Sequence, residues 1–268
     1  MNASKPAELQ RQIREAMRHS KDSIFAESRV FEEYLVANAW RYALTMDQLT
    51  AAHGRSLVGA SVLDIGSYPG HLAAVLQRFE CAQVHAVSLM TNAAFEECMG
   101  ELGIRVSLCD VERDPLPAPD GTIDIVLCCE LIEHLDGDVM HMLREARRIM
   151  APGGFFLLTT PNHASMMHRW NLLRGRSVYP ILDNPDYPFY AGAGVRNPMR
   201  HIREFTLEEI GGLLKAAGFR SASTITSSPP LTNHSRLSWR GEVLTRGLRA
   251  LERLLAEAGT QMIAIARP

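Results

Sequence analysis

From residue 61 onward, short apolar runs alternate with longer stretches that have helical periodicity. The strand-like runs are residues 61–65, 84–89, 105–109, 123–129, 154–160, 221–226 and 261–266. Helical patterns separate them at 70–80, 91–102, 137–150 and 207–217. Continuous apolar strands separated by helices are typical of a mostly parallel sheet that is covered on both faces. The alternation therefore predicts an α/β protein with a seven-stranded, mostly parallel sheet.

Two parts of the chain depart from this alternation. Residues 1–60 have helical patterns throughout, including the amphipathic stretch VFEEYLVANAWRYALTMDQL. We interpret 1–60 as a helical extension that packs on the sheet or caps its ligand crevice, and 61–268 as the main domain. The segment 163–203 is too long for an ordinary connection, and long connections are usually functional. We expect 163–203 to cover a substrate pocket with its aromatic side chains, which are Trp170, Tyr179, Tyr187, Phe189 and Tyr190.

Composition narrows the class of protein. Hydrophobic residues make up 46% of the chain and charged residues 22%, which is ordinary for a globular domain with a full core. The net charge of −2 gives no general electrostatic reason to expect a nucleic-acid partner. The N-terminus has no apolar signal-peptide core, and no apolar run has the length of a membrane span. The five cysteines lack CxxC spacing and lie in or beside apolar segments, which is typical of reduced thiols in a cytoplasmic protein.

The stretch SVLDIGSYPGHLAAVL, residues 61–76, carries an acid at the end of an apolar run and two glycines before an apolar helix. A glycine-rich turn after a strand often brings the backbone close to a ligand. The glycines alone are equally compatible with a tight turn that has no ligand. Open parallel sheets bind ligands beyond the carboxyl ends of their strands, where we expect Asp64, Gly66, Asp110 and Glu130 to lie.

The order of these signals resembles that of the class I methyltransferases, which use S-adenosylmethionine. The run DIGSYPG, residues 64–70, resembles the first motif of that family. The run CDVERDPLPAPDGTIDIVLCCELIEHL resembles its acid after the third strand, its proline-rich loop and its fourth strand. Two later runs, LREARRIMAPGGFFLLTTPN and REFTLEEIGGLLKAAGF, resemble its fifth strand and its late helix. The resemblance covers residues 60–226 and implies a Rossmann-like class I methyltransferase fold.

The resemblance also implies a site for S-adenosylmethionine. Asp110 would accept a hydrogen bond from the adenine amino group, with Val111 beside the ring. Tyr68 replaces the usual middle glycine of the first motif, and Ser88 stands where the family has an acid that holds the ribose hydroxyls. A neutral hydroxyl should bind the ribose less strongly than a carboxylate. The implied cofactor-binding residues are Asp64, Gly66, Ser67, Tyr68, Gly70, Ser88, Asp110, Val111 and Glu130.

Glu130, Glu133 and His134 follow the fourth strand run closely, and a helical turn there would place them on one face. His201 lies far downstream, just before the late helix. Two carboxylates and two imidazoles predict a site for one divalent cation, Mg²⁺, Mn²⁺, Fe²⁺ or Zn²⁺. The same run with a later histidine resembles metal-dependent O-methyltransferases of small-RNA termini and of catechol-type quinone precursors. In the alternative without a metal, His134 is a catalytic base or has only a structural role, and His163 is a second candidate base.

We interpret the chain as an S-adenosylmethionine-dependent methyltransferase that acts on a hydroxyl group of a small-molecule acceptor, such as a sugar, a secondary metabolite or a quinone precursor. One alternative is an RNA ribose 2′-O-methyltransferase, which the near-neutral charge disfavours. Another is a protein that binds the cofactor without turnover, to which the departures at Tyr68 and Ser88 lend weight. The sequence leaves a homo-oligomer open.

Overall fold

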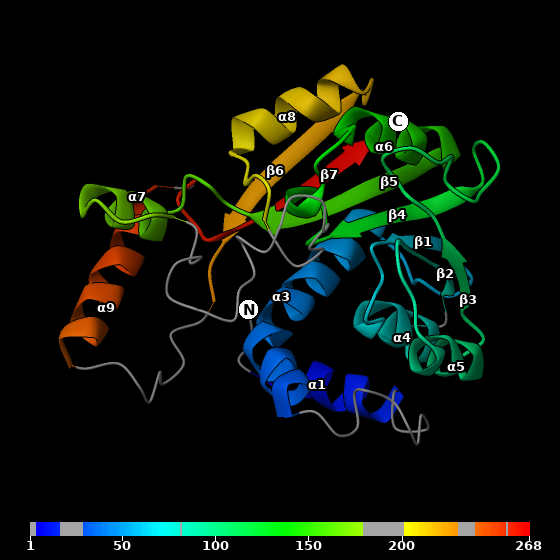
Figure 1. Ribbon diagram of the computed structural model, residues 1–268, viewed down its shortest axis with the longest axis horizontal. Helices are drawn as coiled ribbons and strands as arrows, with labels where there is room; N and C mark the ends of the chain where they lie inside the picture. The colour runs from blue at the N-terminus through cyan, green and yellow to red at the C-terminus, as the bar shows by residue number, and fades with distance from the viewer. Residues whose placement is uncertain (1–3, 17–28, 81, 179–200, 230–238, 256) are drawn as a thin grey trace, which may run out of the picture.

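The computed structural model describes residues 4–16, 29–80, 82–178, 201–229, 239–255 and 257–268 (Figure 1). Within them, seven strands form one sheet in the order β3-β2-β1-β4-β5-β7-β6. The strands are β1 (Ser61–Ile65), β2 (Gln83–Ser88), β3 (Arg105–Leu108), β4 (Ile123–Cys129), β5 (Met150–Pro161), β6 (Ser221–Ser227) and β7 (Gln261–Arg267). Neighbours among β1 to β5 pair in parallel, whereas β7 is antiparallel to both β5 and β6. The predicted mostly parallel sheet is confirmed.

Helices cover both faces of the sheet (Figure 1). One face packs against α1 (Ser4–Ala16), α3 (Arg29–His53), α4 (His71–Arg78) and α5 (Ala93–Glu101). The other face packs against α6 (Val139–Ile149) and α8 (Leu207–Ala216). Two further helices, α7 (Met166–Leu173) and α9 (Trp239–Leu254), contact each other at one end of the molecule. A short 3-10 helix, η1 (Ile132–His134), follows β4.

The alternation of side chains along each strand divides the core into two layers. On β1, Val62 belongs to the apolar cluster under α3 and α4, whereas the next residue, Leu63, belongs to the cluster under α6 and α8. Both residues are buried, as expected for a strand that is covered on both faces. Among the described cysteines, Cys98, Cys109 and Cys128 are buried free thiols and Cys129 is half-buried.

The N-terminal helices contribute directly to this core. Leu35, Ala43 and Leu49 of α3 are buried in the same cluster as the strand residues. Helix α3 therefore packs on the same face of the sheet as α4 and α5. No helix in the described part of the chain combines the length and the apolarity that crossing a membrane requires.

Candidate functional site

The carboxyl ends of β1, β2, β3 and β4 lie along one edge of the sheet, since these strands are parallel. After β1 the chain adds β2 and β3 on one side and β4 on the other, so the direction of the strand order reverses next to β1. Ligands of open α/β sheets bind at such a switch point. Gly66, Ser88, Asp110 and Glu130 all lie at or within two residues of these strand ends.

The backbone itself requires both glycines of the turn after β1. Gly66 has a φ of +75° and Gly70 a φ of +88°, in the left-handed region that favours glycine. A Cβ atom on Gly66 would lie 3.0 Å from the side chain of Leu131, and one on Gly70 would lie 2.6 Å from Cε of Met99. The course of the chain and its packing therefore explain these glycines without a ligand.

The other polar residues of this turn are directed into the protein. Asp64 is only 4% exposed, and burial raises the pKa of its carboxyl to about 7. Ser67 is also buried. Tyr68 accepts a hydrogen bond from Asn92 at 3.2 Å, and its ring packs on Phe95 with 5.2 Å between the ring centroids. Tyr68 is thus held against the start of α5.

Ser88 and Asp110 lie side by side because Cys109 donates its N–H to the Ser88 carbonyl at 3.0 Å. The Ser88 hydroxyl is engaged locally, since it donates to the carbonyl oxygen of Met90 at 2.7 Å. Asp110 keeps its carboxylate partly exposed, at 20% of the side-chain surface, and Val111 beside it is buried. Asp110 and Val111 remain predicted for the adenine, whereas the hydroxyl of Ser88, predicted for the ribose, is engaged with Met90.

The Glu130 side chain is directed toward β5 and β7. Its φ of 53° is unusual for a residue other than glycine and sets it apart from η1. Its carboxylate forms an ion pair with Arg41 of α3 and accepts hydrogen bonds from Thr159, at 2.8 Å, and from Gln261. Both partners of the ion pair keep about a fifth of the side chain exposed.

Sequence reasoning missed Arg41, because nothing in its helical surroundings marks it as a site residue. The next residue on α3, Tyr42, has its hydroxyl 2.8 Å from Nδ1 of His71, the first residue of α4. Burial lowers the pKa of His71 to about 3, so its ring is neutral at pH 7. Two consecutive residues of α3 therefore contact the site: Arg41 pairs with Glu130 after β4, and Tyr42 contacts the first residue of α4.

Glu133, His134 and His201 meet beside this edge of the sheet. Their ligand atoms all lie within 4.8 Å of one another. The two imidazole rings have centroids 4.9 Å apart at an interplanar angle of 79°, and His134 Nε2 lies 3.9 Å from Glu133 Oε1. The backbone N–H of Ile202 donates to the Glu133 carbonyl at 2.6 Å, which fixes the downstream segment against η1.

Glu133 is the most buried member of this group, with no exposed surface. Burial, together with the nearby charge of Glu130, raises the pKa of its carboxyl well above the usual value. One oxygen, Oε2, accepts a hydrogen bond from Thr160 at 2.8 Å, whereas Oε1 has no hydrogen-bond partner among the described residues. Glu130, predicted as a fourth ligand, lies outside this group because its carboxylate is directed to Arg41, Thr159 and Gln261.

His163, the second candidate base, lies after β5 in a different group, with His168 and Glu204. Its ring centroid is 6.2 Å from that of His168. Of the aromatic residues expected to cover a substrate, Trp170 lies on α7 and is half-buried. The other four, Tyr179, Tyr187, Phe189 and Tyr190, lie outside the described residues.

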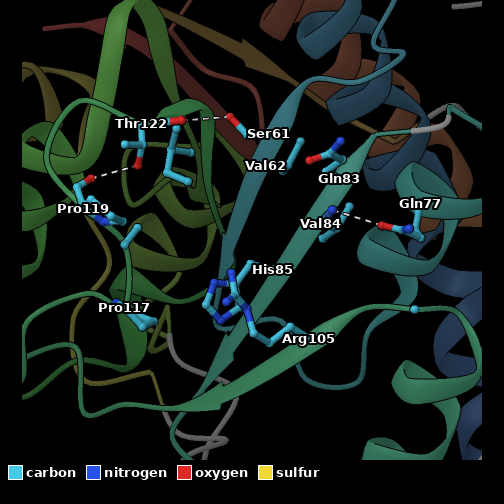
Figure 2. Close-up of a pocket in the computed structure, with 13 residues that line it drawn as sticks. Ser61, Val62, Gln77, Gln83, Val84, His85, Arg105, Pro117, Pro119 and Thr122 are labelled. Carbon is cyan, nitrogen blue, oxygen red and sulfur yellow. Dashed lines mark hydrogen bonds between the residues drawn. The ribbon is translucent and has the colours of Figure 1, made fainter.

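A cavity of about 600 Å³ lies at the opposite edge of the sheet (Figure 2). It is lined by the first residues of four strands, Ser61, Gln83, Arg105 and Ile123, and by the loop 117–119. His85 also lines it, and burial lowers the pKa of its imidazole to about 4. The amino ends of parallel strands are not where such sheets bind their cofactors, and none of the predicted site residues lines this cavity.

Comparison with known proteins gives matches to methyltransferases. Residues 37–224 match a family model described as a methyltransferase domain. A probable S-adenosylmethionine-dependent methyltransferase of Mycolicibacterium smegmatis is 33% identical over 110 residues, which cover 41% of this chain and 34% of that protein. Human methyltransferase-like protein 27 is 32% identical over 122 residues, which cover 46% and 49% of the two chains. The chain thus spans half or less of the length of these relatives.

A ubiquinone biosynthesis O-methyltransferase of Xanthomonas euvesicatoria is 26% identical over 245 residues, covering 84% of this chain and 94% of that protein. Among solved structures, a SAM-dependent methyltransferase from Archaeoglobus fulgidus superimposes with a TM-score of 0.56 at 19% identity, over 88% of this chain and 99% of that one. The family match spans most of the chain, and the sheet has the same fold as that structure. The chain therefore belongs to the class I S-adenosylmethionine-dependent methyltransferase family.

Proposed function

We propose that this protein transfers the methyl group of S-adenosylmethionine to a hydroxyl group of a small-molecule acceptor. The observation that carries the proposal is the convergence of Glu133, His134 and His201 beside the cofactor edge of the sheet. A hydroxyl is a weak nucleophile until its proton is removed, so its methylation benefits from a base or a bound cation. The similarity to a ubiquinone biosynthesis O-methyltransferase over 94% of that protein's length supports an oxygen acceptor.

The switch point offers groups that suit the cofactor. Bound S-adenosylmethionine supplies a methyl group on a positively charged sulfur, and its methionine part carries an ammonium and a carboxylate. Arg41 and Glu130 present a cation and an anion close together at the end of β4, which matches those two charges. We infer that Asp110 accepts from the adenine amino group, with the buried side chain of Val111 against the ring.

The donor set of Glu133, His134 and His201 fits a divalent cation. One carboxylate and two imidazoles favour Mn²⁺, Fe²⁺ or Zn²⁺ over Mg²⁺, which prefers oxygen ligands. The buried Oε1 of Glu133 lacks a hydrogen-bond partner among the described residues, and an unpartnered buried oxygen is costly unless something binds it. A cation held there would lower the pKa of the acceptor hydroxyl. In the alternative without a cation, His134 itself accepts the hydroxyl proton, with His163 as the second candidate.

Two further parts of the chain are assigned to the acceptor side. We propose that α1 and α3 close one side of the crevice, since Arg41 and Tyr42 contact its edge directly. We propose that segment 163–203 covers the acceptor and keeps water from the sulfonium, as a closing segment does in many transferases. Its position directly between His163 and His201 in the sequence supports this role.

The test is a methyl-transfer assay in which the full chain, labelled S-adenosylmethionine and a fractionated extract of small metabolites are incubated together. Mass detection identifies the methylated product, and mild base treatment separates ethers from esters. We expect an O-methyl ether, and no transfer with the His134→Ala variant. Variant His141→Ala serves as the control, because His141 lies on α6 and outside the group of Glu133, His134 and His201. Products methylated only on nitrogen or carbon would contradict the proposal.

A further inference from the structure

A second cluster of ligand-type side chains lies next to the one assigned above. His163, His168 and Glu204 each offer one ligand atom, and these atoms all lie within 4.8 Å of one another. We propose that these three residues form a second divalent-cation site, linked to the first through Glu204. The fold holds the three side chains together before any ion binds.

The segment that carries His163 is fixed from both sides. Asn162 is fully buried, and its side-chain N–H groups donate to the carbonyls of Glu257 at 2.8 Å and Gly259 at 2.7 Å. The N–H of His163 donates to the Phe205 carbonyl at 2.9 Å, in an isolated parallel bridge between the two segments. This bridge brings Glu204, the neighbour of Phe205, beside His163.

His168 is positioned by the start of α7. Ser165 caps this helix, and its hydroxyl accepts a hydrogen bond from the His168 N–H at 3.2 Å. His168 Nδ1 lies 3.2 Å from the His163 carbonyl and 3.3 Å from Glu204 Oε2. Its side chain is 17% exposed, so solvent and ions can reach it while most of its surface is covered.

Glu204 links the two clusters. Its carboxylate is almost entirely buried, and its two oxygens face different imidazoles. Oε1 lies 3.0 Å from Nδ1 of His201, and Oε2 lies 3.3 Å from Nδ1 of His168. A carboxylate that accepts from one ring nitrogen of a ligand histidine orients the other nitrogen toward the metal. Glu204 would therefore serve the second site as a ligand and the first site by orienting His201.

The chemistry of this cluster selects the kind of ion. Two imidazoles and one carboxylate suit a divalent transition metal of borderline softness, and Zn²⁺ binds such sets tightly. The competing interpretation is a network of hydrogen bonds and ion pairs in which the histidines simply share the buried carboxylate. The two interpretations differ in how many ions the chain binds, which can be counted without the methyl-transfer reaction.

The experiment uses the full chain after treatment with a chelator and dialysis. Equilibrium dialysis against Zn²⁺ with elemental analysis counts the bound ions, and Co²⁺ absorption reports the ligand field of each site. We expect about two ions per chain for the unmodified protein and about one for His168→Ala and for His163→Ala. His134→Ala should also bind about one ion, whereas His141→Ala should bind as many as the unmodified protein. Circular dichroism without metal confirms that each variant is folded.

The two sites can fail separately in this experiment. Equal ion counts for the unmodified protein, His168→Ala and His163→Ala would overturn the second site, even if His134→Ala loses an ion. If His168→Ala loses an ion and His134→Ala does not, the second site stands and the cation of the proposed function is contradicted. A protein that binds neither Zn²⁺ nor Co²⁺ would overturn both. Glu204→Gln adds an independent check, since it should weaken the binding of both ions by about tenfold or more.

Discussion

Arg41 on α3 forms an ion pair with Glu130, the residue that follows β4 and lies 89 positions later in the chain. This contact ties α3 to the edge of the sheet where the cofactor is expected. Glu130 keeps two other hydrogen bonds, from Thr159 and Gln261, so its position does not depend on Arg41 alone. Arg41 is therefore a residue that can be changed without dismantling the site.

We expect Arg41→Gln to weaken S-adenosylmethionine binding by about tenfold, because a charged hydrogen bond to the cofactor carboxylate is worth about 1.5 kcal/mol or more. Calorimetry measures the affinity, and Arg55→Gln is the control, since Arg55 is an exposed residue near the end of α3. If Arg41→Gln binds S-adenosylmethionine with unchanged affinity, Arg41 does not contact the cofactor and its role is structural.

The glycine turn can be tested with a matched pair of variants. Gly59 and Gly66 share a φ of +75°, but a Cβ on Gly59 meets nothing within 4 Å, whereas one on Gly66 meets Leu131. Both Gly59→Ala and Gly66→Ala should lose about 1–2 kcal/mol of folding free energy to left-handed strain. Only Gly66→Ala should also weaken cofactor binding. Denaturant unfolding and calorimetry check these outcomes, and equal affinities in the two variants would place the cofactor away from the turn.

The buried carboxyl of Asp64 predicts a pH dependence of stability. Its pKa rises from 3.8 to about 7 on folding, so between these pH values the folded protein holds a proton that the unfolded chain has lost. This contribution therefore makes stability fall as pH rises from about 4 to about 7, by an amount on the order of 4 kcal/mol.

The Asp64→Asn variant should lack this pH-dependent contribution to stability, because an amide does not titrate. Urea unfolding of the cofactor-free protein at several pH values measures it, with Asp120→Asn as an exposed control. The stability of Asp64→Asn relative to the unmodified protein should increase steadily across the interval. A constant difference between the two would show that Asp64 is ionised in the folded protein.

Strands such as β4 and β7 could be predicted from the sequence because they contain continuous apolar runs, and the predicted bounds of β1 and β4 match those observed. The first four residues of β5, Met150–Gly153, were not predicted, because a Pro-Gly-Gly sequence begins within them and predicts a turn; the pairing of β4 with β5 there has a register shift. The role of Glu130 could not be predicted. Its spacing from Glu133 suggested one helical face, but its left-handed backbone directs it to β5 and β7 instead.

His201 was grouped with His134 because both are metal-ligand types and because the run resembles metal-dependent enzymes, and their rings lie 4.9 Å apart in the structure. Periodicity alone carries no information about such a distant pair. The contact depends on the backbone bond from Ile202 to Glu133 and on the orientation of His201 by Glu204, which are both tertiary features.

The proposed cation beside the methyl acceptor gives the last prediction. Treatment with EDTA should stop methyl transfer without preventing S-adenosylmethionine binding. The predicted cofactor residues other than Glu130 lie at or just beyond the ends of β1, β2 and β3, whereas Glu133 and His134 belong to η1 and His201 precedes α8. Addition of Mn²⁺ or Zn²⁺ should restore transfer. His201→Ala should behave like the chelated enzyme and lose activity by about 100-fold, a typical effect of removing a metal ligand or general base.

The variants that lose methyl transfer distinguish activation of the acceptor by a cation from general-base catalysis by His134. If a cation activates the acceptor, His134→Ala and His201→Ala fail together, and both keep normal cofactor affinity by calorimetry. If His134 acts alone as a general base, the chelated enzyme keeps its activity and only His134→Ala is inactive. The second pattern would also predict that transfer declines as His134 becomes protonated at low pH, because an imidazolium cannot accept the hydroxyl proton. A chelated enzyme with full activity would therefore contradict the cation and assign the chemistry to the imidazole.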